Sequence, residues 1–241
     1  MIKPALLMVG LVALSVPHSQ AADVDVAIVF AVDVSGSIDA ATANLQRDGH
    51  AEAIVAPEVN AAIDRGRFGC IAIAYVEWAS LGQMRTVMPW TSICDLEDSQ
   101  IAAALIRRKA SKGNGCRRRC GTSISFAIDV SALLLDSYVG YASNRIIDIS
   151  ANGTNNDGQP VQPSRLQAIS KGITINAIAV PTIMRGVRHH LVDYFAENVI
   201  GGAGAFAIEP ATKNDYVVAL RRKLVIEIGM SGNAPARNPM Q

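Results

Sequence analysis

Aromatic residues are scarce in this sequence of 241 residues, where Phe, Trp and Tyr together make up 5%. Excess charge is also missing, because 22 basic residues nearly cancel 21 acidic ones. A near-neutral protein is a poor candidate for nucleic-acid binding, which needs clustered excess positive charge against the phosphates. Half of the residues are apolar, with abundant Ala, Ile and Val, and this composition favours an α/β architecture over an all-β sandwich.

No apolar run long enough to span a membrane occurs outside the first 22 residues. Within them, Lys3 precedes an almost wholly apolar stretch at 5–16, Pro17 breaks that stretch, and small residues stand at 19 and 21. This layout is typical of a secretory signal peptide, so we predict that residues 1–22 are removed and that the mature protein is periplasmic or secreted. The alternative is an uncleaved N-terminal anchor. Loss of Lys3 takes the formal net charge from +1 to 0.

The sequence contains no CxxC motif and no histidine near its four cysteines, which argues against a structural zinc site. Export makes disulfides possible for Cys70, Cys94, Cys116 and Cys120, and three full pairings remain open. Cys116 and Cys120 could close a small ring. Cys70 lies inside an apolar strand pattern, and a buried free thiol is the alternative for this residue.

Strand-like and helix-like segments alternate along the chain without an internal repeat. Strands are expected at 24–32, 68–78, 83–90, 145–150, 173–180 and 205–209. Helices are expected at 39–55, with Ser37 or Asp39 as the cap, and at 95–109, 122–135, about 164–171, 189–199 and 213–228. This order predicts a doubly wound α/β domain at 23–230, with a mostly parallel sheet, one antiparallel edge strand and helices on both faces. A flexible tail is expected at 231–241.

The loop after the first expected strand carries Asp33, Ser35 and Ser37, one acid and two hydroxyls at alternate positions. In parallel sheets, ligands bind beyond the carboxyl ends of the strands. Oxygen donors with one carboxylate suit a hard cation such as Mg²⁺, and Gly36 lets the backbone bend closely around the ion. The competing interpretation is a Ser/Asp cluster that merely caps a helix.

This Asp-x-Ser-x-Ser element resembles the metal-ion-dependent adhesion site of von Willebrand factor A and integrin-type inserted domains, over nearly the whole mature chain. The resemblance implies two further ligands. Thr122 corresponds to the threonine of the family's second loop, and Asn152 stands before Gly153 where the third loop normally has an aspartate. Because a negative charge is missing there, we expect weaker cation binding.

Three other segments look like an uncharacterised bacterial family of exported proteins with this domain. These segments are Gln46 to Gly49, Tyr75 to Trp78, and the pair Asn155 and Asn156.

The expected function is an exported, metal-dependent, adhesion-type module that uses Mg²⁺, Mn²⁺ or Ca²⁺ to bind a carboxylate of a protein ligand. The chain is not expected to be an enzyme, because it has neither Gly-x-Gly-x-x-Gly after the first strand nor Gly-x-Ser-x-Gly. Two alternatives stay open. One is a metal-assisted phosphoryl-transfer or hydrolytic enzyme, and the other is a structural domain with a degenerate metal site. The sequence indicates no oligomeric state.

A basic segment precedes Thr122. Seven Lys and Arg residues fall within 107–119 without an acid, and Arg117, Arg118 and Arg119 are expected on the rim of the metal site. They act either as a collar that steers an acidic partner or as a solvated helix end and loop. The acids Asp129, Asp148 and Asp157 are expected to be solvated or to start helices, and His50, His189 and His190 to be surface or capping residues.

Overall fold

The computed structural model describes residues 22–113, 116, 120–181 and 191–230. Apart from residue 22, the predicted signal peptide and the predicted C-terminal tail lie outside these residues. The same holds for Arg117, Arg118 and Arg119 and for His189 and His190. The proposals about these segments therefore stay predictions.

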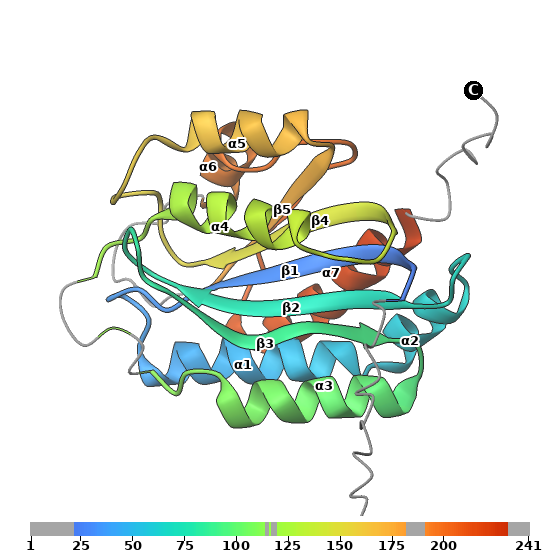
Figure 1. The fold of residues 1–241 in the computed structure, drawn as a ribbon. Coiled ribbons are helices and arrows are strands. Elements are labelled where there is room, and N and C mark those ends of the chain that lie inside the picture. The colour runs from blue at the N-terminus through green and yellow to red at the C-terminus, as the bar shows by residue number, and fades with distance from the viewer. Residues whose placement is uncertain (1–21, 114–115, 117–119, 182–190, 231–241) are drawn as a thin grey trace, which may run out of the picture.

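One six-stranded sheet forms the centre of the described structure, in the order β3-β2-β1-β4-β5-β6 (Figure 1). Its strands are β1 (Val24–Asp33), β2 (Ile71–Trp78), β3 (Met84–Ile93), β4 (Ala142–Ala151), β5 (Ile173–Ala179) and β6 (Ala207–Ile208). All neighbouring strands are parallel except β2 and β3, which are antiparallel. The predicted doubly wound fold with one antiparallel edge is confirmed.

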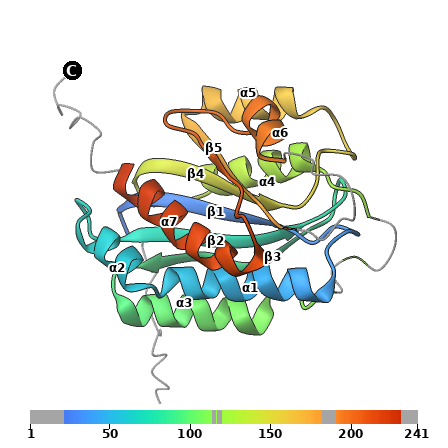
Figure 2. The same ribbon diagram turned by 180° about the vertical axis from the view of Figure 1, so that it is seen from behind.

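Helices cover both faces of the sheet. They are α1 (Ala40–Ile54), α2 (Pro57–Asp64), α3 (Leu96–Lys109), α4 (Ile124–Asp136), α5 (Val161–Ser170), α6 (Leu191–Asn198) and α7 (Tyr216–Gly229), with a 3₁₀ turn at Lys213–Asp215. α1, α2, α3 and α7 pack on one face, and α4, α5 and α6 on the other (Figures 1 and 2). The short helix α2 was not predicted. It begins at Pro57, whose fixed φ and missing N–H suit the first turn of a helix.

Strand β1 shows why the sheet lies between two helical layers. All ten of its residues are buried, as expected for a parallel strand that is covered on both faces. Val26, Ile28 and Phe30 belong to the apolar core under α1 and α7, whereas Ala27 and Val29 belong to the core under α4. The strand therefore holds its carboxyl end, and the loop that follows, in a fixed position.

Two disulfides, Cys70–Cys94 and Cys116–Cys120, connect the four cysteines. Of the alternatives that the sequence left open for Cys70, the disulfide is confirmed and the free thiol is excluded. Cys70 comes just before β2 and Cys94 just after β3, and the antiparallel register places Ile71 opposite Ile93. The two cysteines therefore meet at the open end of this strand pair.

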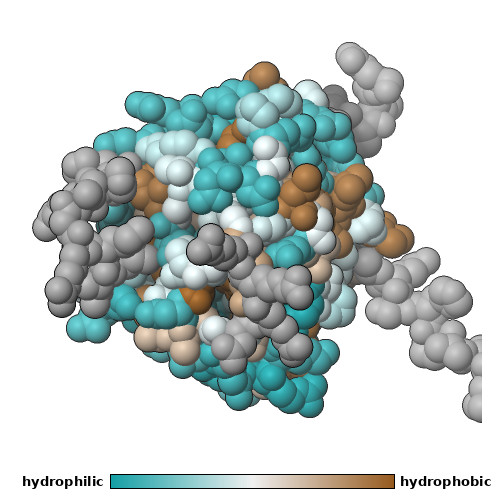
Figure 3. All heavy atoms as spheres, turned by 90° about the vertical axis from the view of Figure 1, so that its left-hand side faces the viewer, coloured by the Kyte–Doolittle hydropathy of each residue, from teal (hydrophilic) through white to brown (hydrophobic). Residues whose placement is uncertain are grey.

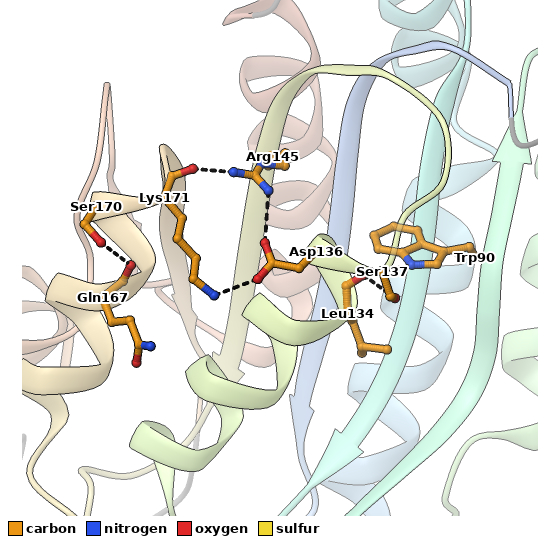
Figure 4. Close-up of polar contacts among 8 residues, drawn as sticks. All are labelled: Trp90, Leu134, Asp136, Ser137, Arg145, Gln167, Ser170 and Lys171. Atoms are coloured by element: carbon orange, nitrogen blue, oxygen red, sulfur yellow. Dashed lines mark hydrogen bonds and ion pairs between the residues drawn. The ribbon is translucent and has the colours of Figure 1, made fainter.

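At the amino end of the parallel strands, charged side chains neutralise one another (Figure 4). Asp136, at the end of α4, lies 2.6 Å from Nζ of Lys171 and 3.2 Å from Nη1 of Arg145. The hydrogen bond from Lys171 contributes most to a pKa of Asp136 that is lower than usual. At this end of the sheet, the acidic side chain therefore has basic partners from the same chain.

Within the described residues, the helices are all too short or too polar to cross a membrane.

Candidate metal site

The first loop of the site leaves the sheet at Asp33, the last residue of β1. Oδ1 of Asp33 accepts a hydrogen bond of 2.7 Å from the backbone N–H of Ser35, which closes a tight turn. The backbone carbonyl of Asp33 accepts a bond of 2.9 Å from Nε2 of Gln46 in α1. Asp39 caps α1 by accepting a bond from the N–H of Thr42, so the hydroxyl of Ser37 is not used as a helix cap.

The carboxylate of Asp33 is buried and only partly satisfied. Its side chain is inaccessible to solvent, and Oδ2 has no hydrogen-bond partner. Burial raises the pKa of Asp33 to about 6, although hydrogen bonds from Ser35 and from the backbone of Asn152 act in the opposite direction. A buried carboxylate oxygen without a partner is costly, and a cation beside it would remove that cost.

A continuous row of oxygen atoms crosses from the first loop to two others. Oγ1 of Thr122 donates to Oγ of Ser35 at 3.1 Å, and this hydroxyl lies 3.3 Å from Oγ of Ser37. Oγ of Ser37 donates to Oδ1 of Asn152 at 2.8 Å. The structure thus brings together all five residues singled out in the sequence, although it does not test their role as ligands.

Close backbone contacts hold the first two loops together. The N–H of Gly36 donates to the carbonyl of Cys120 at 3.2 Å. A Cβ atom at position 36 would lie 3.0 Å from that carbonyl oxygen, a tight contact that a glycine avoids. Cys120, two residues before Thr122, also forms the disulfide with Cys116.

The donor set fits a hard cation. It consists of one carboxylate, three hydroxyls and one amide oxygen, the kinds of ligand that Mg²⁺ and Ca²⁺ take. No group of three or more His, Cys, Asp and Glu side chains in the described part of the chain could hold a metal ion. The oxygen row beside Asp33 contains a single acid and so lies outside that class of sites, but its hard oxygen donors suit a cation.

Asp148 was expected to be solvated or to start a helix, and this expectation is wrong. It is fully buried within β4, and its Oδ2 lies 2.7 Å from Nζ of Lys223 in α7. Lys223 also pairs with Glu227, whose Oε1 accepts a further bond of 2.7 Å from Asn176. This cluster lies under α7. Asp148 can be buried there because Lys223, which is distant in the sequence, neutralises its charge.

The other two acids are not buried. Asp129 accepts a hydrogen bond of 3.1 Å from Gln159, and Asp157 one of 3.1 Å from the N–H of Leu81.

His50 was expected at the surface, and it is instead completely buried. Its ring lies 4.9 Å from that of Phe30 and 5.5 Å from that of Tyr75, centroid to centroid. Nδ1 contacts the carbonyl of Gln46 at 2.7 Å, and burial lowers the pKa of the imidazole. His50 is a core residue of α1 and does not reach the oxygen row.

Basic residues described near the site are Arg107, Arg108 and Lys109, which are exposed at the end of α3, and the exposed Lys112. Figure 3 views the molecule from the side on which β1 ends, where teal and white residues make up most of the face that is not grey.

The sheet order and the helices on both faces give the chain a von Willebrand factor A-like fold. The chain belongs to the family described as "Protein of unknown function (DUF1194)", whose model matches residues 23–232. The curated proteins compared with this sequence include no match.

Several solved structures are similar in fold. Proximal thread matrix protein 1 from the mussel byssus, described with a zinc-occupied MIDAS motif, has a TM-score of 0.60 and 20% identity over 86% of this chain and 48% of that chain. The pilus adhesin SpaC from Lactobacillus rhamnosus GG has a TM-score of 0.58 and 11% identity, over 86% of this chain and 31% of that chain. A von Willebrand factor type A protein from Catenulispora acidiphila has a TM-score of 0.56 and 13% identity, over 87% of this chain and 43% of that chain. This chain thus spans less than half the length of each.

Proposed function

We propose that this chain is an exported binding module that holds one divalent cation at the carboxyl end of β1 and uses it to bind a carboxylate of a protein ligand. The observation that carries the proposal is the buried Asp33. Its Oδ2 has no partner, and it lies beside a row of hydroxyl and amide oxygens from three loops.

Asp33, Ser35, Ser37, Thr122 and Asn152 are the residues that would hold the ion. The cation would supply a Lewis-acidic position for an incoming carboxylate. Mg²⁺ is the first choice because every donor is a hard oxygen, with Mn²⁺ or Ca²⁺ as substitutes. The mussel protein with zinc in its motif supports a divalent cation at such loops, although it is only 20% identical to this chain.

Asn152 gives the site a distinctive charge. With an amide in place of an acid, Asp33 is the single carboxylate among the five residues. Such a site binds the cation more weakly, but it leaves more of the ion's positive charge uncompensated, which favours an anionic ligand. The similarity to a pilus adhesin and a matrix protein supports a protein as that ligand.

Two observations support export. The first 22 residues have the layout of a signal peptide. All four cysteines form disulfides, which persist in oxidising compartments such as the periplasm or the extracellular space.

The test is isothermal titration of Mg²⁺ and Mn²⁺ into the purified protein, beside the double variant Ser35→Ala/Ser37→Ala. Wild-type binding that disappears in the double variant supports the site. No binding of either ion by the wild type overturns the proposal and favours the structural alternative, in which Asn152 marks a degenerate site. A phosphatase assay addresses the enzyme alternative, and metal-dependent turnover would favour it.

The basic rim belongs to the same proposal. We expect reversal of charge at Arg117, Arg118 and Arg119 to slow association with an acidic partner, because like charges reduce electrostatic steering. An unchanged association rate at low salt would exclude the rim from binding.

A further inference from the structure

We propose that Asn156 positions Thr122 for cation binding. The loop after β4 would then have two roles: it contributes Asn152 as a ligand, and it holds the loop that carries Thr122 in place. This inference rests on the proposed metal site. It arises from hydrogen bonds that join two loops 34 positions apart in the chain.

Asn156 holds the backbone of Thr122 from both sides. Its side-chain Oδ1 accepts a hydrogen bond of 2.7 Å from the N–H of Thr122. Its own backbone N–H donates to the carbonyl of Thr122 at 2.9 Å. Because both backbone polar groups of Thr122 are bound to Asn156, the direction of the Thr122 side chain is set by the loop after β4.

Thr122 needs this support because it lies between a loop and a helix. Helix α4 begins at Ile124, and Ser123 at its cap position forms no side-chain capping bond. The capping oxygen comes from the neighbouring Asn155, whose Oδ1 accepts a bond of 3.1 Å from the N–H of Ser125. An orphan N–H in the first turn of α4 is thereby satisfied by the same loop that holds Thr122.

The loop after β4 is itself anchored. The N–H of Asn155 donates to the hydroxyl of Tyr194 in α6 at 3.1 Å, and its Nδ2 donates to the carbonyl of Gln159 at 3.1 Å. The approach of the two loops also needs a glycine at position 121, since a Cβ there would lie 2.6 Å from Cβ of Asp157 and 3.0 Å from Oδ1 of Asn156. The contacts of Asn155 thus anchor the loop on the residue next to Asn156, which is itself exposed.

At the other end of this arrangement, Oγ1 of Thr122 donates to Oγ of Ser35 in the first loop. A displacement of the Thr122 backbone would move that hydroxyl away from Asp33 and Ser35 without changing any proposed ligand. Partners that orient metal ligands in this way typically contribute about 10- to 100-fold to metal affinity.

The experiment compares Mn²⁺ affinity, by titration calorimetry, among the wild type and three variants. We expect Asn156→Ala to weaken binding about tenfold or more, because it removes the acceptor for the Thr122 N–H. Asn156→Asp retains an acceptor oxygen at the same place and should keep most of the wild-type affinity. Thr154→Ala is the matched control, because this exposed side chain in the same loop has no hydrogen-bond partner among the described residues.

Two additional measurements separate positioning from general loss of structure. Hydrogen exchange of the Thr122 amide should become faster in Asn156→Ala and stay slow in Asn156→Asp, while the metal-free unfolding midpoint of each variant gives its stability. If Asn156→Ala does not fold, Asn156→Gln keeps the amide but shifts its oxygen by one methylene, and the same loss of affinity is expected.

The outcomes distinguish the two proposals. Wild-type Mn²⁺ binding with unchanged affinity in Asn156→Ala overturns the role of Asn156 and leaves the metal site standing. Absence of Mn²⁺ binding in the wild type overturns the metal site and this inference with it. Equal losses in Asn156→Ala, Asn156→Asp and Thr154→Ala would mean that the loop tolerates no change, and would also refute a specific role for Asn156.

Discussion

Asp33 and Asp148 lie on the neighbouring strands β1 and β4, and both are fully buried. Asp148 faces Lys223 at 2.7 Å, so the chain supplies its counterion. Asp33 has no ion-pair partner among the described residues, and this is the difference between the two acids, since oxygens of both carboxylates lack a hydrogen-bond partner. Burial of an unpaired carboxylate is unfavourable, whereas a paired one can be tolerated. The comparison indicates that Asp148 has a structural role, and it supports the proposal that a cation from outside the chain neutralises Asp33.

The two regions are also connected by hydrogen bonds. Gln46 donates to the carbonyl of Asp33 and accepts, through Oε1, a bond of 2.8 Å from the hydroxyl of Ser150. That hydroxyl lies 2.8 Å from the hydroxyl of Tyr216, the first residue of α7. Hydrogen bonds from β4 and α7, the elements that hold Asp148 and Lys223, thus reach the backbone of the loop that carries the candidate site.

The largest effect is expected from removing the counterion of Asp148. Lys223→Met should lower the free energy of unfolding by roughly 3–5 kcal/mol, because it removes the ion-pair partner of two buried carboxyl groups, Asp148 and Glu227. Urea denaturation measures the change. The matched control is Lys171→Met, which breaks a partly exposed pair with Asp136 and should cost less than about 1 kcal/mol. Equal losses in the two variants would contradict the contrast between buried and exposed pairs.

Neutralising the other buried aspartate, Asp33, should change metal binding strongly and the free energy of unfolding only slightly. Asp33→Asn keeps an oxygen for the Ser35 N–H, so the metal-free free energy of unfolding should stay within about 1 kcal/mol of wild type. Binding of Mg²⁺ and Mn²⁺ should disappear, because the single carboxylate of the site is gone. Calorimetric titration and urea denaturation of the same variant test both parts. Strong destabilisation by Asp33→Asn would instead make Asp33 a structural acid like Asp148.

The cluster under α7 should make stability depend on pH. Burial raises the pKa of Glu227 to about 7, against the opposing effect of Lys223. A raised pKa means that the folded state binds the proton more tightly, so this contribution is complete below the ordinary pKa of a glutamate and is lost as pH rises through about 7. The slope is at most about 1.4 kcal/mol per pH unit for one proton.

Glu227→Gln should remove that slope. Because Asp33 and His50 also titrate with shifted pKa values, the quantity to measure is the difference in unfolding free energy between wild type and Glu227→Gln, from roughly pH 5 to 8. A difference that does not change with pH would show that Glu227 has an ordinary pKa.

The smallest effect is expected at Asn152. Asn152→Asp should tighten Mg²⁺ binding by roughly 2 kcal/mol, the attraction between one negative charge and a divalent cation at about 4 Å in water. Titration of Mg²⁺ into this variant and into wild type gives the difference. Unchanged affinity would mean that position 152 does not contribute to the cation's surroundings.

Much of the fold could be predicted from the sequence because β1 is a continuous apolar run and the helices after it carry recognisable caps such as Asp39 and Asp95. Helix α2 was missed since it has only eight residues and closely follows α1. The burial of His50 and Asp148 could not be predicted, because their neighbours Tyr75 and Lys223 come from distant parts of the chain.

The residues that come together at the candidate site could also be predicted in part from the sequence. Asp33, Ser35 and Ser37 form a local pattern, and Thr122 and Asn152 followed from a resemblance to a known family. The residues that hold the loops in place carry no local pattern. Gln46 and Asn156 act through backbone groups of Asp33 and Thr122, and only the folded arrangement shows these contacts.

The disulfide Cys70–Cys94 has a consequence for self-association. An edge strand exposes unpaired N–H and C=O groups that can template the addition of a foreign strand. On this sheet, β3 is the long edge, and the disulfide fastens it to β2 at one end while the bond from the N–H of Ala79 to the carbonyl of Gln83 closes the other. The opposite edge, β6, has two residues. The disulfide therefore keeps β3 from detaching from the sheet, and β6 is too short to template a long added strand.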